Sequence, residues 1–267
     1  MKTNKLYIIL LLCTFLGFSQ TNFTVDGVNY KITDPNLNTV SIIGGTVSGD
    51  LILPETVNNG DIEYSVTHIE NGAFRDNKKL TSVTIGNRVT SIGNSAFRRT
   101  ILTSVTIGSS VTSIGDLAFA DNTTLTTMIV KATIPPTLGA HAIANRSNID
   151  LTIPEGSKNA YAAAGWTGFF SVNGVISIGT DFSVDGIAYT ITSNTPYEVD
   201  LKGTSDIVEE FVIVDEVTFR DVSFSITGVA ASAFRGTNFS SVTIGSSVTS
   251  IGNLAFAENT TLTTMIV

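Results

Sequence analysis

The chain has 267 residues, of which 14% are charged and 42% hydrophobic, and its 23 acidic and 15 basic residues give a formal net charge of −8. This length and composition predict a folded, β-rich protein and exclude a disordered chain. The acidic balance argues against nucleic acid as the general partner, because phosphate backbones attract basic surfaces.

Residues 1–19 have the features of a secretory signal peptide. Two lysines begin the segment, an almost unbroken apolar run follows, and small residues end it. We predict cleavage between Ser19 and Gln20. The apolar run is shorter than the roughly 20 residues that span a bilayer, and no later stretch approaches that length. We therefore expect a secreted or cell-surface protein with no transmembrane helix.

The single cysteine, Cys13, lies inside the predicted signal peptide. The mature chain would then form no disulfide, thiolate metal site or cysteine nucleophile. A lipoprotein anchor at Cys13 is a minor alternative, because the large Leu12 stands where a small residue is expected. Removal of the leader takes away two of the 15 basic residues and no acidic one, which leaves a formal net charge of −10.

Two segments are predicted to form β-hairpins. Residues 23–33 and 182–192 each contain an alternating strand, an Asp-Gly turn and a second alternating strand. Each segment precedes a block of repeats. We interpret residues 20–50 and 181–221 as caps that cover the open end of a solenoid.

A short internal repeat follows the first cap. Residues 80–97, LTSVTIGNRVTSIGNSAF, return with a period of 22 as residues 102–119, LTSVTIGSSVTSIGDLAF. A weaker copy precedes them, and a partial copy begins at Leu125. Much later in the chain, residues 242–267 match residues 105–130 at 24 of 26 positions.

One copy of the repeat has more apolar side chains than it can bury alone. Val83 and Ile85 predict a short strand with Thr84 facing outward. Stacked coils would bury these positions against each other, so we predict a solenoid. We expect three phenylalanines to stack in its interior, namely Phe74, Phe97 and Phe119. We also expect four glycines to adopt positive φ at sharp turns, namely Gly86, Gly93, Gly108 and Gly115.

Residues 151–170 are predicted to close the first module, which covers residues 51–170. Ser157 can start a short helix and Gly165 can end it, which leaves Tyr161 and Trp166 to cover the last coil.

The remaining segments are a linker and a second repeat block. We assign residues 171–180 to the linker and residues 222–267 to the second module. Because Val267 corresponds to Val130 of the first module, we expect the second module to be incomplete.

These repeats resemble the BspA-like leucine-rich-repeat family of Bacteroidetes-type bacterial proteins. The motifs that carry the resemblance are LTSVTIG at 80–86, VTSIGNSAF at 89–97 and the ending IPEGSK at 153–158. The resemblance implies a β-rich leucine-rich-repeat solenoid of 22–23-residue coils, with short strands, short helical or 3-10 turns and β-hairpin caps in two tandem modules. It also implies a secreted or surface protein that acts in adhesion and has no enzyme activity.

The chain departs from the family pattern in two places. Arg88 and Ser110 replace the asparagine that many leucine-rich repeats place after the strand, so no asparagine ladder is expected. The coil that begins at Leu125 has Ile143 in place of phenylalanine and inserts Pro135-Pro136.

The sequence contains few residues that could catalyse a reaction or bind a metal ion. Only two histidines are present, and His68 and His141 align with outward positions that other coils fill with serine. We predict no catalytic residue, metal or cofactor. Calcium at Asp121-Asn122 is only a minor alternative, because that corner supplies a single carboxylate and calcium sites usually have several.

Two surface features are candidate binding sites. The first is a stacked hydroxyl face of the strands, for which the plain alternative is that threonine suits exposed strands. The second is a corner at which two arginines should stand one above the other and could hold a carboxylate or sulfate. For this corner, an ordinary solvated surface is the alternative. The residues of the face are Thr81, Ser82, Thr84, Thr103, Ser104, Thr106, Thr126 and Thr127, and those of the corner are Arg75 and Arg98.

The sequence thus favours a non-catalytic protein that binds an extracellular protein or glycan. The alternative is a structural spacer that carries a functional or sorting domain beyond Val267. Hydrolysis of a surface polymer by an unidentified pair of carboxylates and ice binding by a threonine lattice are remote alternatives. The sequence makes no prediction about the oligomeric state.

Overall fold

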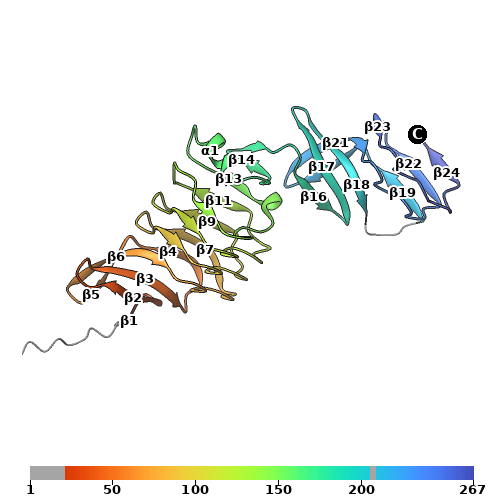
Figure 1. Cartoon of the computed structure of the whole chain (residues 1–267). Coiled ribbons are helices and arrows are strands. Elements are labelled where there is room, and N and C mark those ends of the chain that lie inside the picture. Colours follow the sequence, from red (N-terminus) through yellow and green to blue (C-terminus); the bar gives the residue numbers. More distant parts are fainter. Residues whose placement is uncertain (1–21, 205–208) are drawn as a thin grey trace, which may run out of the picture.

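The computed structural model describes residues 22–204 and 209–267. The predicted signal peptide and Cys13 lie outside these residues. Within them, no helix is both long and apolar enough to cross a membrane. Figure 1 shows two groups of β-strands placed end to end, one from β1 to β15 and the other from β16 to β24.

The first module has two sheets, which we call sheet A and sheet B. Sheet A contains eight strands: β1 (Asn22–Val25), β2 (Val28–Asp34), β3 (Thr39–Gly45), β6 (Ile62–Ile69), β8 (Ser91–Ile92), β10 (Ser113–Ile114) and β12 (Thr137–Leu138) in this order, with β5 (Thr56–Asn59) beside β6. Sheet B contains seven: β4 (Gly49–Leu53), β7 (Leu80–Ile85), β9 (Ser104–Ile107), β11 (Thr127–Val130), β13 (Asp150–Thr152), β14 (Ser171–Val172) and β15 (Val175–Ile176).

Each coil contributes one strand to each sheet and then returns through a turn. Val83 of β7 pairs in parallel register with Val105, which pairs with Met128, and all three side chains are buried. The next residues along these strands are Thr84, Thr106 and Ile129, and they face outward, as the period of two in a strand requires. This register confirms the predicted leucine-rich-repeat solenoid.

The turn that leaves sheet A carries the aromatic stack. The ring centroids of Phe74 and Phe97 are 5.3 Å apart, and those of Phe97 and Phe119 are also 5.3 Å apart, with interplanar angles of 14° and 1°. Ile143 forms a β-bridge with Phe119 and occupies the equivalent position in the next coil. The predicted phenylalanine stack is confirmed, and its three buried side chains belong to the hydrophobic core of the first module.

The four repeat glycines do not have positive φ, so that prediction was wrong. Positive φ occurs instead at the turn after sheet A, where Ser95, Leu117 and His141 have φ of 56°, 57° and 52°. The glycines are needed because neighbouring coils approach too closely for a side chain. A Cβ atom on Gly93 would lie 2.6 Å from the backbone nitrogen of Asn71.

A ladder of side-chain amides and carboxylates is present, although none was expected. The Oδ1 of Asn71 accepts the backbone N–H of Asn94 at 2.7 Å, the Oδ1 of Asn94 accepts that of Asp116 at 2.8 Å, and the Oδ1 of Asp116 accepts that of Ala140 at 2.7 Å. This ladder lies after the strand in sheet A. The expectation failed because it considered only the corner at Arg88 and Ser110.

Both predicted hairpins are present as antiparallel pairs. In the first, β1 pairs with β2 around Asp26 and Gly27, whose φ values are 49° and 78°. In the second, Asp185 and Gly186 have φ values of 49° and 79°. Two consecutive positive φ values are typical of the tight turns that match the twist of a hairpin.

The closing segment of the first module contains a short helix and two buried aromatic side chains, and we call it the lid. Helix α1 (Lys158–Ala163) follows Ser157, whose hydroxyl donates to the Pro154 carbonyl and accepts no hydrogen bond from a helix N–H. The Tyr161 hydroxyl donates to the Ala132 carbonyl at 2.6 Å, and Trp166 Nε1 donates to the Pro136 carbonyl at 2.9 Å. The lid therefore holds the inserted proline loop of the last coil. The 3-10 helix η1 (Arg146–Asn148) precedes β13.

The second module repeats the two-sheet plan. One sheet contains β16 (Asp181–Val184), β17 (Ile187–Asn194), β18 (Tyr197–Thr204), β21 (Val222–Val229) and β20 (Glu216–Phe219), with β23 (Ser250–Ile251) beside β21. The other contains β19 (Glu210–Ile213), β22 (Ser241–Ile244) and β24 (Thr264–Ile266). Phe170 and Ile176, which come from the end of the first module, pack into the core of the second.

Candidate functional site

The outward side chains of sheet B form two rows across neighbouring coils. In the first row Ser82 pairs in register with Ser104, and Ser104 with Thr127. In the second row Thr84 pairs with Thr106, and the next position is Ile129. The second row therefore contains two hydroxyls and ends in an apolar residue.

The threonines that begin each strand are not part of these rows. The Thr103 hydroxyl donates to the Thr81 carbonyl at 3.1 Å, and the Thr126 hydroxyl donates to the Thr103 carbonyl at 3.4 Å. The Thr81 hydroxyl donates to the Asp50 carboxylate at 3.2 Å. These hydroxyls link one coil to the next, so they are less available to a ligand.

Carboxylates lie at both ends of the first row. Asp50 accepts a hydrogen bond from the Ser82 hydroxyl at 2.6 Å. At the other end, Asp150 pairs in register with Thr127 and accepts hydrogen bonds from Ser171 and Arg220. Both carboxylates already have partners inside the protein.

Four hydroxyls remain between these ends, and we call them the hydroxyl face. Within residues 22–204 and 209–267 their side-chain oxygens make no hydrogen bond, and the side chains are half-buried. At the β4 edge the face borders Ile52, whose side chain is 74% exposed. The residues of the hydroxyl face are Thr84, Ser104, Thr106 and Thr127.

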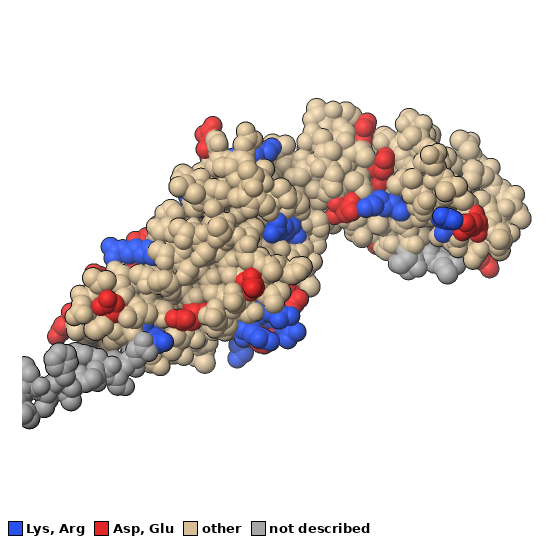
Figure 2. Space-filling view, viewed as in Figure 1, with Lys and Arg blue, Asp and Glu red and all other residues tan. Residues whose placement is uncertain are grey.

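The arginine corner is an ion-pair network. Arg75 Nε lies 3.3 Å from the Asp76 carboxylate, and Arg98 Nε lies 2.9 Å from that of Asp121, which Arg99 also approaches at 3.4 Å. The hydrogen bond from Arg98 lowers the pKa of the Asp121 carboxyl. Figure 2 shows basic and acidic side chains together at the lower edge of the first module. Each guanidinium that was expected to hold an anionic ligand thus already has a carboxylate beside it.

The histidines lie where the sequence placed them. His68 pairs in register with Ser91 and its Nδ1 lies 2.8 Å from the Thr67 hydroxyl, whereas His141 occupies an exposed turn. Among the residues that the structure describes, no group of three or more histidine, cysteine or acidic side chains converges to hold a metal ion.

Asn122 has a structural role that the sequence analysis did not identify. Its buried amide donates to the carbonyls of Phe97 at 2.8 Å and Phe119 at 3.1 Å, and its carbonyl accepts a hydrogen bond from Thr100. A side chain with these contacts cannot also ligate calcium at the Asp121 corner. The signal was in the sequence, since Asn259 recurs at the same place in the second module.

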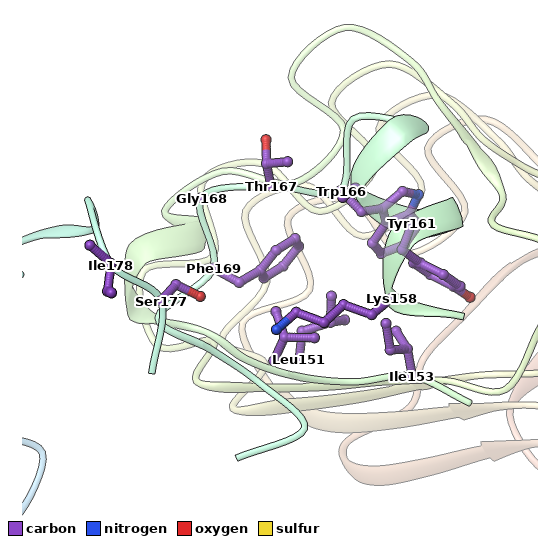
Figure 3. Close-up of a pocket in the computed structure, with 12 residues that line it drawn as sticks. Leu151, Ile153, Lys158, Tyr161, Trp166, Thr167, Gly168, Phe169, Ser177 and Ile178 are labelled. Atoms are coloured by element: carbon purple, nitrogen blue, oxygen red, sulfur yellow. The ribbon is translucent and has the colours of Figure 1, made fainter. Parts of the chain in front are cut away.

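A pocket of about 240 Å³ lies at the lid of the first module. Figure 3 shows Phe169 and Leu151 on its walls, with Lys158 extending across it and Ser177 entering from the opposite side. Its floor consists of lid and core side chains that are almost fully buried. The pocket is therefore a small hollow in the lid and lies apart from the hydroxyl face.

Stacked parallel strands at a spacing of 22–23 residues, closed at one end by a hairpin cap, define a leucine-rich-repeat solenoid protein. The chain matches the BspA type leucine rich repeat region in six copies, over residues 55–164 and 209–267, and it belongs to this family. The resemblance noted in the sequence is thereby confirmed.

Several solved structures of leucine-rich repeat proteins are similar to the chain at low identity. A leucine-rich repeat protein from Bacteroides capillosus ATCC 29799 is 22% identical, with a TM-score of 0.42 over 50% of this chain and 98% of that chain. One from Bacteroides ovatus ATCC 8483 is 17% identical, with a TM-score of 0.40 over 90% and 81%. A leucine rich cell surface protein from Faecalibacterium prausnitzii A2-165 is 17% identical, with a TM-score of 0.28 over 93% and 77%. Comparison with curated proteins gave no match.

Proposed function

We propose that the chain is a non-catalytic extracellular protein that binds a glycan or protein through the hydroxyl face. The observation that carries the proposal is that Thr84, Ser104, Thr106 and Thr127 lie in register on rigid strands with no hydrogen-bond partner among the described residues. Hydroxyls held in this way can donate to and accept from a ligand without first being ordered, which favours binding.

Two further observations support this function. The apolar leader at 1–19 has the composition of a signal for export. The carboxylates nearest the hydroxyl face, Asp50 and Asp150, are engaged by hydroxyls or a guanidinium, so neither is a free acid or base for hydrolysis.

The threonines of sheet A provide no second lattice that could bind ice. The hydroxyls of Thr90, Thr112 and Thr137 each donate to a backbone carbonyl of the preceding coil. Threonine recurs in this sheet because it joins the coils, and its hydroxyls do not form an open lattice.

The test is binding of residues 20–267 to immobilised matrix proteins and to a glycan array. We expect saturable binding to at least one ligand, and we expect the T84V/T106V variant to weaken it because the shape is kept and two hydroxyls are lost. The matched control is T123V/T192V, which changes two exposed threonines away from the face. Equal binding by both variants would reject the hydroxyl face, and no binding by the unaltered chain would reject the function.

A structural spacer is the second candidate function. The observation that favours it is the set of contacts between the modules, in which Arg220 donates to Asn148 and Asp150, 72 and 70 residues earlier in the chain. The sequence of the full-length gene distinguishes the two functions, because a spacer requires a further domain.

A further inference from the structure

We propose that the Phe219-Arg220 tip of the β20–β21 hairpin is a docking element that holds the second module in one orientation on the end of the first. The partner surface is the closing end of the first module, around Phe170, Asn148 and Asp150. The hairpin belongs to the cap of the second module, so this cap would serve both as the cover of its own coils and as the connection to the preceding module.

The guanidinium of Arg220 meets three oxygens of the first module. Its Nη1 donates to the Asn148 carbonyl at 3.1 Å, and its Nη2 donates to the Thr126 carbonyl at 3.4 Å and to the Asp150 carboxylate. Only 22% of the Arg220 side chain is exposed. A planar donor with several N–H groups suits such a fan of acceptors, and a lysine would not reproduce its geometry.

Aromatic contacts complete the junction. The Arg220 guanidinium carbon lies 4.9 Å from the ring centroid of Phe170, and the Phe219 ring meets the same ring edge-on at 5.4 Å. Phe219 also stacks on Phe182 of its own module at 4.5 Å. Phe170 is thereby enclosed by the second module, and only 4% of it is exposed.

The first module shows what the same hairpin looks like without a partner. Its equivalent, β5–β6, pairs Val57 with Tyr64 as β20–β21 pairs Val217 with Phe224, and its tip is Asn59-Gly60. Both tip residues are exposed, and nothing lies within 4 Å of a Cβ atom built on Gly60. The first module therefore has a small polar tip in solvent where the second has an aromatic residue and an arginine.

The backbone at this position favours glycine in both modules. Gly60 has a φ of 62° and Arg220 a φ of 52°, in the left-handed region that side chains other than glycine, asparagine and aspartate rarely adopt. An arginine in this conformation is unfavourable locally. Its contacts with the first module explain why it is found there.

The docking also defines the space between the modules. A groove of about 540 Å³ lies at the junction, lined by Asp150 and Phe170 on one side and by Tyr197, Arg220 and Asp221 on the other. Release of the tip would open this groove and free the second module to rotate about residues 177–180, which connect β15 to β16.

The experiment measures the distance between the modules with a pair of spin labels. Residues 20–267 contain no cysteine, so T123C in the first module and T192C in the second provide unique exposed attachment points. With the natural tip we expect a narrow distance distribution. We expect the R220G variant to broaden it, because glycine suits the backbone and removes only contacts with the first module.

The control is R235A, which breaks the Arg235–Glu258 ion pair inside the second module and should leave the distribution narrow. F219N/R220G, which installs the tip of the first module, should broaden the distribution at least as much as R220G. A distribution that is equally narrow with R220G, or equally broad with the natural tip, would overturn the proposal. Because R220G touches no core contact of the second module, a circular dichroism spectrum like that of the unaltered chain is expected.

Discussion

A Cβ atom on Gly108 would lie 2.7 Å from the carbonyl carbon of Gly86 in the preceding coil. Real Cβ atoms do not approach backbone this closely, so the coils must separate wherever this glycine is replaced. The stacking distance of the solenoid thus depends on residues that have no side chain.

We therefore expect G108A to lower the free energy of unfolding by about 1–3 kcal/mol, the usual effect of overpacking a close contact. G108N should be at least as harmful, because the reason for glycine here is space and not positive φ. The check is urea denaturation followed by circular dichroism. S110A, at an exposed position of the same corner, should change the value by less than about 0.5 kcal/mol. Tolerance of G108N would show that the conformation, and not the contact, selects glycine.

Replacement of Asn122 by aspartate should destabilise the first module by about 3 kcal/mol, because a buried carboxylate cannot donate to the carbonyls of Phe97 and Phe119 as the amide does. N259D makes the same change in the second module, where the equivalent side chain is only half-buried, and should have a smaller effect. The denaturation midpoints of the two variants measure these effects. An equal loss of stability in both, or a larger loss in N259D, would contradict the role of burial.

The ion pair at Asp121 should contribute to stability only where its carboxyl is ionised. The hydrogen bond from Arg98 lowers the pKa of this carboxyl below its usual value of 3.8. Because the pKa is lower in the folded than in the unfolded chain, the ionised carboxyl stabilises the fold fully above pH 3.8. This stabilisation is lost as the pH falls through the pKa of the folded protein. D121N should therefore be less stable than the natural chain at neutral pH, and the difference should disappear in acid. A difference that is constant with pH would exclude the ion pair as its cause.

The lid should weaken in alkali through Tyr161. Burial raises the pKa of this phenol from 10.0 to about 12, so the neutral form stabilises the fold below pH 10 and this contribution is lost as the pH rises towards 12. Y161F should cost about 1 kcal/mol below pH 10, from the lost hydrogen bond to Ala132, and should lose less stability in alkali.

Fluorescence of Trp166, the single tryptophan, reports on the same lid. Tyr30, whose pKa is also raised to about 12, remains in both proteins and serves as an internal control. Identical alkaline transitions in the natural chain and Y161F would contradict this assignment.

The solenoid was predictable because its core follows a strict period. Phe74, Phe97 and Phe119 recur at one position of the coil, and repeated burial requires a repeated side chain. The hairpins were predictable for a similar reason, since Asp-Gly between alternating strands has few other conformations.

The surface was harder to predict, because its contacts are set by atoms of neighbouring coils. Thr103 and Thr106 are both threonines of one strand region, yet one hydroxyl bonds to the backbone and the other is free. Arg98 was expected to be open to a ligand, but the turn of the next coil brings Asp121 to it. Arg220 lies 70 residues from Asp150, and no local pattern indicates their contact.

The ladder that runs from Asn71 through Asn94 and Asp116 to Ala140 gives the coils of Asn94 and Asp116 the same two ends. Each of these two coils offers a side-chain oxygen to the coil after it and a backbone N–H to the coil before it. An extra copy of 22 residues inserted into the gene would arrive with both halves of this connection already in place. The solenoid can therefore lengthen by duplication without new contacts having to evolve, because an inserted coil would form the same hydrogen bonds with both of its neighbours.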